Sequence, residues 1–228
     1  MKITFRYQDS THLNIKSMSL IGSFNNYDMQ KGKMELFQNE WIYTTEINEG
    51  EYLYRFVINN SLEVVDPEGG LFYADSNAKI WSLLLVDTND QRLHNPNPSS
   101  LNIESYYIYS KITDQHLVRN KKQFNLNYDN QVCVMFKFTN VIGIHHVSIV
   151  WMSPFKSILK IEEYPIYINN ASEPNETSLL SVLSFDNDWN TFPSKGWLAR
   201  LFVNGTFILE DEFEIHSSTE YSSLGRYK

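Results

Sequence analysis

Short segments of alternating apolar and polar residues run along most of the chain. In its first part they lie at 3–7, 17–22, 41–46, 51–59 and 79–86, and turn-forming stretches such as Asn48-Glu49-Gly50 separate most of them. A period of two residues puts successive side chains on opposite faces of a strand. Short strands at this spacing predict an all-β protein built of sandwiches, and no segment has the pattern of an amphipathic helix of normal length.

The strand pattern is interrupted once, after Asp87. The sequence from there to Ser100 is polar, contains two prolines and has no strand pattern, so we interpret 88–100 as a linker. Beyond it lie candidate strands at 106–112, 117–124, 132–138, 145–152, 178–185, 197–203 and 207–215. We therefore expect two tandem immunoglobulin-like (early-set type) β-sandwich domains, at 1–87 and 101–215, followed by a polar tail at 216–228.

Composition narrows the function classes. The 228 residues are 42% hydrophobic and 14% aromatic, which is enough material for packed cores. The net charge of -8 gives no basic footprint, so we expect neither a nucleic acid nor a membrane as partner. The N-terminus has a strand pattern instead of a secretion signal, and the single Cys133 fits a reducing compartment. Together these features predict a cytoplasmic protein.

Several phrases of the first part occur in a recognisable order. They are Leu-Ile-Gly-Ser-Phe-Asn-Asn-Tyr at 20–27, Trp41, Gly-Glu-Tyr-Leu-Tyr-Arg-Phe-Val-Ile-Asn-Asn at 50–60, and Asp66-Pro67. In order and spacing this set resembles the glycogen-binding module (carbohydrate-binding module family 48) of AMP-activated protein kinase β subunits and of branching and debranching enzymes. The resemblance covers about residues 1–87. The phrase at 196–205 is similar only to the closing hairpin of generic immunoglobulin-like domains.

The resemblance implies a carbohydrate-binding site. In the family, aromatic rings stack on flat sugar faces, while a cationic and an amide side chain bond the hydroxyls. By resemblance, Tyr27 is the stacking platform, Arg55 the cationic donor and Asn77 the amide. The family's second tryptophan position falls on Leu62, which has no ring.

Without the resemblance, the same residues have ordinary interpretations. Tyr27 is then a surface tyrosine in a turn, and Arg55 is a solvated strand residue. Phe72 and Tyr73 are candidates to replace the missing second ring.

No constellation points to catalysis. The residues after the first domain are too few for a (β/α)8 barrel of about 250 residues. Neighbouring carboxylates at Glu162-Glu163 and Glu210-Asp211-Glu212 point to opposite faces of a strand, so we interpret them as solvated charge. His145-His146 and Cys133 lack the spacing of metal ligands and are interpreted as packing residues. We expect no enzymatic activity, no metal and no cofactor.

Two functions of different classes are left open. One is a non-catalytic intracellular protein that binds or targets an α-glucan such as glycogen or starch. The other is a structural or regulatory protein-interaction protein whose sugar site has decayed. Trp189, in a loop rich in Asp and Asn, is interpreted as a plug at the end of the second sandwich, with sugar binding as its alternative.

Overall fold

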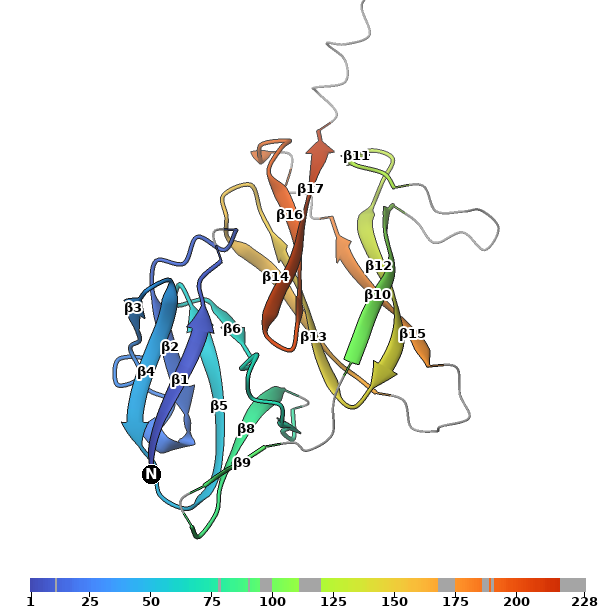
Figure 1. Cartoon of the computed structure of the whole chain (residues 1–228). Helices are drawn as coiled ribbons and strands as arrows, with labels where there is room; N and C mark the ends of the chain where they lie inside the picture. The colour runs from blue at the N-terminus through green and yellow to red at the C-terminus, as the bar shows by residue number, and fades with distance from the viewer. Residues whose placement is uncertain are drawn as a thin grey trace, which may run out of the picture.

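The computed structural model describes residues 1–10, 12–77, 79–89, 91–94, 100–110, 120–167, 175–185, 189 and 191–217. These residues form strands and short 3-10 turns, among them η1 (Ser23–Asn25), and none of them lies in an α-helix, so the all-β prediction is confirmed (Figure 1). The strands before the predicted linker or within it are β1 (Lys2–Gln8), β2 (Met18–Gly22), β3 (Glu35–Phe37), β4 (Glu40–Glu46), β5 (Gly50–Ile58), β6 (Leu62–Val64), β7 (Phe72–Ala74), β8 (Ile80–Val86) and β9 (Arg92–Leu93).

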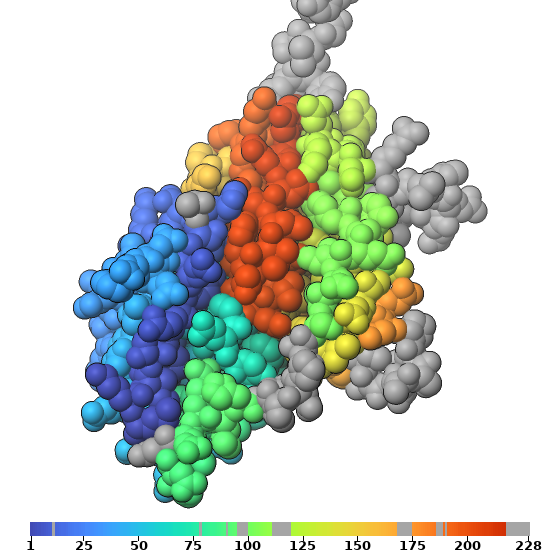
Figure 2. Space-filling model, in the orientation of Figure 1, coloured from blue at the N-terminus to red at the C-terminus, as the bar shows by residue number. Residues whose placement is uncertain are grey.

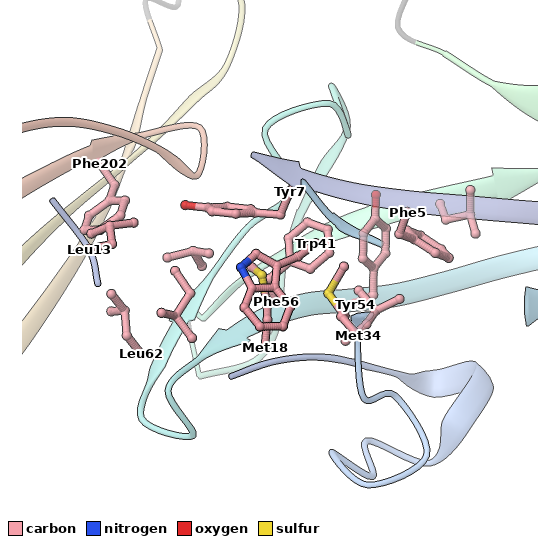
Figure 3. Packing of buried hydrophobic residues seen from close by; sticks show 14 of the residues in the cluster. Phe5, Tyr7, Leu13, Met18, Met34, Trp41, Tyr54, Phe56, Leu62 and Phe202 are labelled. Carbon is pink, nitrogen blue, oxygen red and sulfur yellow. The ribbon is translucent and has the colours of Figure 1, made fainter. Parts of the chain in front are cut away.

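Strands β1 to β9, here called the first unit, form two sheets. One has the order β1-β4-β3, and the other has the order β2-β5-β8-β7, with β6 paired to β5 and β9 paired to β8. Strand β1 shows the alternation that the sequence predicts, since Ile3, Phe5 and Tyr7 are buried between exposed residues. They face Met18, Leu20, Tyr54 and Phe56 of the other sheet in one core (Figure 3).

Strands β10 to β17, here called the second unit, form the other two sheets. They are β10 (Ser100–Tyr109), β11 (Gln123–Asn125), β12 (Gln131–Ile142), β13 (His145–Met152), β14 (Ile158–Ile166), β15 (Glu176–Ser184), β16 (Trp197–Val203) and β17 (Thr206–His216). Sheet β10-β12-β15 packs on sheet β11-β17-β16-β13-β14, in which β11 runs parallel to β17. This is the immunoglobulin-like order, with Trp151 buried on the third long strand, β13.

Several strands differ from the sequence predictions. The interpretation of 88–100 as a segment without strand structure is wrong for Arg92–Leu93, which pairs with Leu85 and Val86. Strand β14 was not expected because its two glutamates and Pro165 break the apolar pattern; Pro165 is tolerated because β14 lies at the edge of its sheet. The short strands β3, β6 and β7 have only three residues each, too few for a period to show. Residues 95–99, 117–119 and 218–228 of the predicted linker, strand and tail lie outside the described residues.

The two units share an apolar core. Every residue of β13 is buried. One set of alternate side chains faces the core of the second unit, and the other set faces the first unit. The residues of the second unit that join the core of the first are Val150, Met152, Leu198 and Phe202. Figure 3 shows Phe202 next to Leu13, and Leu62 and Tyr7 belong to the same cluster. This contact explains why both faces of β16 carry large apolar residues.

The tip of the β16–β17 hairpin lies against the first unit. The turn Asn204-Gly205 has positive φ at both residues, as its sequence predicts. The Tyr7 hydroxyl donates to the Gly205 carbonyl at 3.0 Å. A side chain at position 205 would place its Cβ 1.9 Å from the Val65 carbonyl oxygen, so only glycine fits there. In Figure 2 the orange-red hairpin and the blue and teal parts of the first unit form one continuous surface.

Candidate functional site

The turn after β2 is built to present Tyr27. The Asn25 side chain is buried in this turn: its Oδ1 accepts from the Gly22 amide at 2.9 Å, and its Nδ2 donates to the Leu20 carbonyl at 2.8 Å. Asn26 and Tyr27 then both adopt left-handed backbone with φ of 57°. The family-like phrase therefore holds the turn, and the Tyr27 side chain is left 44% exposed.

Tyr27 belongs to a group of three aromatic side chains. Its ring centroid lies 5.3 Å from that of Trp81 on β8, at an interplanar angle of 64°. Tyr73 on β7 is the direct ladder partner of Trp81, so the two side chains share one face of the sheet. Tyr73 is 49% exposed and Trp81 is half-buried between its neighbours. We call Tyr27, Tyr73 and Trp81 the aromatic platform.

Polar groups of the β7–β8 turn surround the indole of Trp81. Asp75 accepts hydrogen bonds from Trp81 Nε1 at 2.9 Å and from the amides of Asn77 and Lys79 at 2.9 and 3.0 Å. These bonds, that of Trp81 first, lower the pKa of Asp75. The Lys79 ammonium lies 4.6 Å from the ring centre of Trp81 and 2.6 Å from Glu63. The Asn77 side chain is exposed in the β7–β8 turn.

Two of the four predicted site residues are buried. Arg55 is 1% exposed; its Nη1 donates to Glu163 Oε2 at 3.1 Å, its Nη2 donates to Glu163 Oε1, and Nη2 also contacts the Glu63 carbonyl at 3.2 Å. Leu62 is 5% exposed and belongs to the core that both units share. The second unit packs against both positions, so neither side chain reaches the exposed surface at Tyr27. The interpretation of Arg55 as a solvated residue is wrong for the same reason.

The glutamate that pairs with Arg55 is part of a buried charged cluster. His146 Nε2 lies 3.4 Å from Glu163 Oε1, and the His146 side chain is buried. Burial alone would raise the pKa of Glu163, but the neighbouring His146 and Arg55 lower it to about 2. The interpretation of Glu163 as solvated charge is therefore wrong: it joins the second unit to the first.

The other sequence candidates have structural contacts. Glu210 pairs with Arg200 at 2.7 Å, and Asp211 accepts from the Tyr106 hydroxyl at 2.5 Å, so this acidic run is also partly paired. His145 is buried and bonds the Ile142 carbonyl at 2.9 Å. Trp189 packs 4.8 Å from the Trp197 ring at the end of the second core, as predicted for a plug.

Neither a metal site nor a membrane-spanning helix is found among the described residues. Across the described ranges, no group of three or more His, Cys, Asp or Glu side chains has the geometry of a metal site. No helix in the described part of the chain is long and apolar enough to cross a membrane.

Comparisons with known proteins give distant likenesses in fold. No family model matches the chain, and no curated protein does. Among solved structures, an immunoglobulin-like protein from Pseudomonas aeruginosa is 8% identical with a TM-score of 0.37, over 52% of this chain and 98% of that one. The alkylpurine DNA glycosylase AlkC of Pseudomonas fluorescens, bound to DNA containing an abasic site analog, is 10% identical with a TM-score of 0.35, over 52% of this chain and 31% of that one. Neither likeness carries an argument about ligands.

Sequence reasoning missed Trp81, Lys79 and Asp75. The alternating pattern along 79–86 predicts that Lys79 and Trp81 lie on the same face of one strand. This pattern is the sequence feature from which the pair could have been found. The resemblance directs attention to Leu62 instead, and only the folded β7–β8 hairpin brings Tyr73 beside Trp81. Of the predicted residues, Tyr27 and Asn77 lie at this exposed surface.

Proposed function

We propose that this protein is a non-catalytic carbohydrate-binding protein that holds an α-glucan on the aromatic platform. The observation that carries the proposal is the exposed surface of Tyr27 and Tyr73 next to Trp81. Apolar C–H faces of glucose units match aromatic rings, and polar side chains at the rim fix the orientation of the hydroxyls. Asn77 and Lys79 supply an amide and a cation at that rim.

The backbone at Tyr27 supports a role in binding. A tyrosine with φ of 57° adopts a conformation that glycine or asparagine adopts at lower cost. Such residues cost on the order of 1 kcal/mol and cluster at functional sites. Because the Tyr27 ring is 44% exposed, it buries little apolar surface and contributes little to the stability of the fold. The same exposure leaves the ring accessible for stacking on a ligand.

The proposed glucan is bound weakly. Each stacked ring contributes on the order of 1–3 kcal/mol, by analogy with the stacking of bases. With Arg55 and Leu62 buried, the platform lacks two of the family's contacts. A dissociation constant near the millimolar range, about -4 to -6 kcal/mol, follows. We propose the cytoplasm as location because Cys133 is buried and has no cysteine to pair with.

Affinity electrophoresis in native gels containing glycogen tests the proposal. The wild type should be retarded, and Tyr27→Asn and Tyr73→Ala should each lose most of the retardation, about tenfold in affinity for one stacked ring. Phe37→Ala is the matched control, because Phe37 is an exposed ring, 60% accessible, on β3 outside the platform. The proposal fails if the wild type binds neither glycogen, soluble starch nor β-cyclodextrin at millimolar ligand.

One observation favours the alternative of a protein-interaction protein. Strand β3 lies at the edge of its sheet, and its three residues, including Leu36 and Phe37, are all exposed. An open edge with apolar side chains accepts a strand from a partner. If the glycogen gels show no retardation, this edge becomes the best-supported surface of the molecule.

A further inference from the structure

A cavity of about 590 Å³ lies between the two units, away from the aromatic platform. Its walls are the 12–17 segment and the β5–β6 turn on the side of the first unit, and the β13–β14 turn with Arg200 on the side of the second. The lining residues used below are Lys16, Asn59, Ser61, Leu62, Met152, Lys156, Ile158 and Arg200. A volume between about 300 and 1,000 Å³ at a domain interface is typical of a small-molecule site.

The charge of the lining is of one sign. Three cationic side chains line the cavity, and none of the lining residues is Asp or Glu, although the chain as a whole has a net charge of -8. Arg200 is neutralised by Glu210 at 2.7 Å and donates to the His12 carbonyl at 3.1 Å. Lys16 and Lys156 are exposed, and within the described ranges neither has a carboxylate at ion-pair distance.

Hydrogen bonds to backbone groups hold the walls of the cavity in place. Asn59 Oδ1 accepts from the amides of Lys16 and Ser17 at 2.7 and 3.2 Å, and its Nδ2 donates to the Asn14 carbonyl at 3.2 Å. Lys156 has φ of 64°, a left-handed conformation that a lysine rarely adopts, and its amide bonds the Ser153 carbonyl at 2.9 Å. The two unpaired lysines therefore stand on ordered turns of different units.

The floor of the cavity is apolar. Leu62 and Met152 are buried members of the shared core, and Ile158 packs against that core while keeping part of its side chain accessible. A ligand that contacts this floor and both lysines needs an anionic head and an apolar body. We propose that the cavity between the units binds a small amphipathic organic anion, whose head lies between Lys16 and Lys156 and whose body lies on Ile158.

Fluorescence titration of the full chain with 8-anilinonaphthalene-1-sulfonate tests this site, because the probe has a sulfonate head and an apolar body. The wild type should show saturable binding. The double variant Lys16→Gln with Lys156→Gln should bind about tenfold more weakly, because it removes both exposed cations that face the anionic head. Lys2→Gln, an exposed lysine on β1 outside the cavity, is the matched control and should bind as the wild type does.

Two further arms keep the test specific. Ser61→Trp places a ring at the cavity mouth and should abolish binding, whereas Tyr27→Asn should leave it unchanged. N-phenyl-1-naphthylamine, the uncharged counterpart of the probe, should not distinguish the lysine variants from the wild type. Competition by octanoate or by octyl phosphate supports the site and tells a carboxylate head from a phosphate head. Equal binding of the anionic probe by the wild type and the double lysine variant, or competition by neither anion, overturns the proposal.

Discussion

Two regions of the same sheet face have opposite surroundings. At one end Arg55 lies under the second unit, while at the other end Tyr73 and Trp81 remain open to solvent beside Tyr27. The resemblance predicts that Tyr27 and Arg55 belong to one sugar-binding surface, but the second unit covers Arg55 and leaves Tyr27 exposed. Motif spacing therefore locates a residue on a strand, whereas its exposure depends on what the rest of the chain packs against it.

The largest expected effect tests whether the covered region is structural. Phe202 is fully buried and joins the core of the first unit from β16, so Phe202→Ala should lower the free energy of unfolding by about 3–5 kcal/mol. Urea denaturation followed by circular dichroism measures this. Phe37→Ala, at an exposed ring, should change the same quantity by less than about 0.5 kcal/mol. A small effect of Phe202→Ala would mean that the units do not share a core.

The charged pair of the covered region should have the next largest effect. Arg55→Met leaves Glu163 without its main partner and should cost about 2–3 kcal/mol, less than a fully buried pair because the Glu163 side chain remains 17% exposed. Adding Glu163→Gln should recover part of that loss, which a double-mutant cycle measures. Retardation by glycogen should not change in either variant, since neither residue reaches the platform. Additive losses would show that the two side chains do not interact.

The Arg55–Glu163 pair should also make the free energy of unfolding depend on pH in the acidic range. The pKa of Glu163 is lowered from 4.5 to about 2, so its carboxylate stabilises the folded state at a pH above about 4.5. As the pH falls from about 4.5 to 2, the folded state should lose on the order of 2 kcal/mol through this group. Glu163→Gln removes the group and should make the fall in stability over that window shallower. Parallel pH profiles of the two proteins would contradict the assignment.

The smallest effect on stability is expected at the open region. Tyr27→Asn relieves a left-handed tyrosine but loses its contact with Trp81, so its free energy of unfolding should stay within about 1 kcal/mol of the wild type. Thermal unfolding followed by circular dichroism checks this. A variant that keeps its stability while losing glycogen retardation would show that Tyr27 serves binding and not the fold, and a variant that unfolds would show the reverse.

Much of the fold could be predicted from the sequence because burial repeats with a period of two. Strand β16 has the predicted bounds, and β1 alternates as expected. Strand β14 could not be found this way: Glu163 is a polar residue on a buried face, and only the packing of the two units shows Arg55 opposite it. The division into separable domains stays a prediction. Limited proteolysis between 94 and 100 tests it, with the shared core expected to slow the cut.

The candidate site could be predicted only in part. Tyr27 follows from the turn phrase, because Asn25 and Gly22 encode that turn locally. Trp81 and Tyr73 come together through the pairing of β7 with β8. Strand β7 has only three residues, so no alternating pattern in the sequence predicts it. Burial of Arg55 depends on a residue 108 positions further along the chain, which no local pattern encodes.

The position of Phe202 in the core has a consequence for the order in which the chain is made. The first unit ends at Leu93, but four of the side chains that complete its core, from Val150 to Phe202, are added to the growing chain later. At about 5–20 residues per second, this leaves the first unit incomplete for roughly 5 to 20 seconds during synthesis. Throughout that interval Leu13 and Leu62 lack their apolar cover. A nascent chain arrested before β16 should therefore be a substrate for chaperones that bind exposed apolar surface.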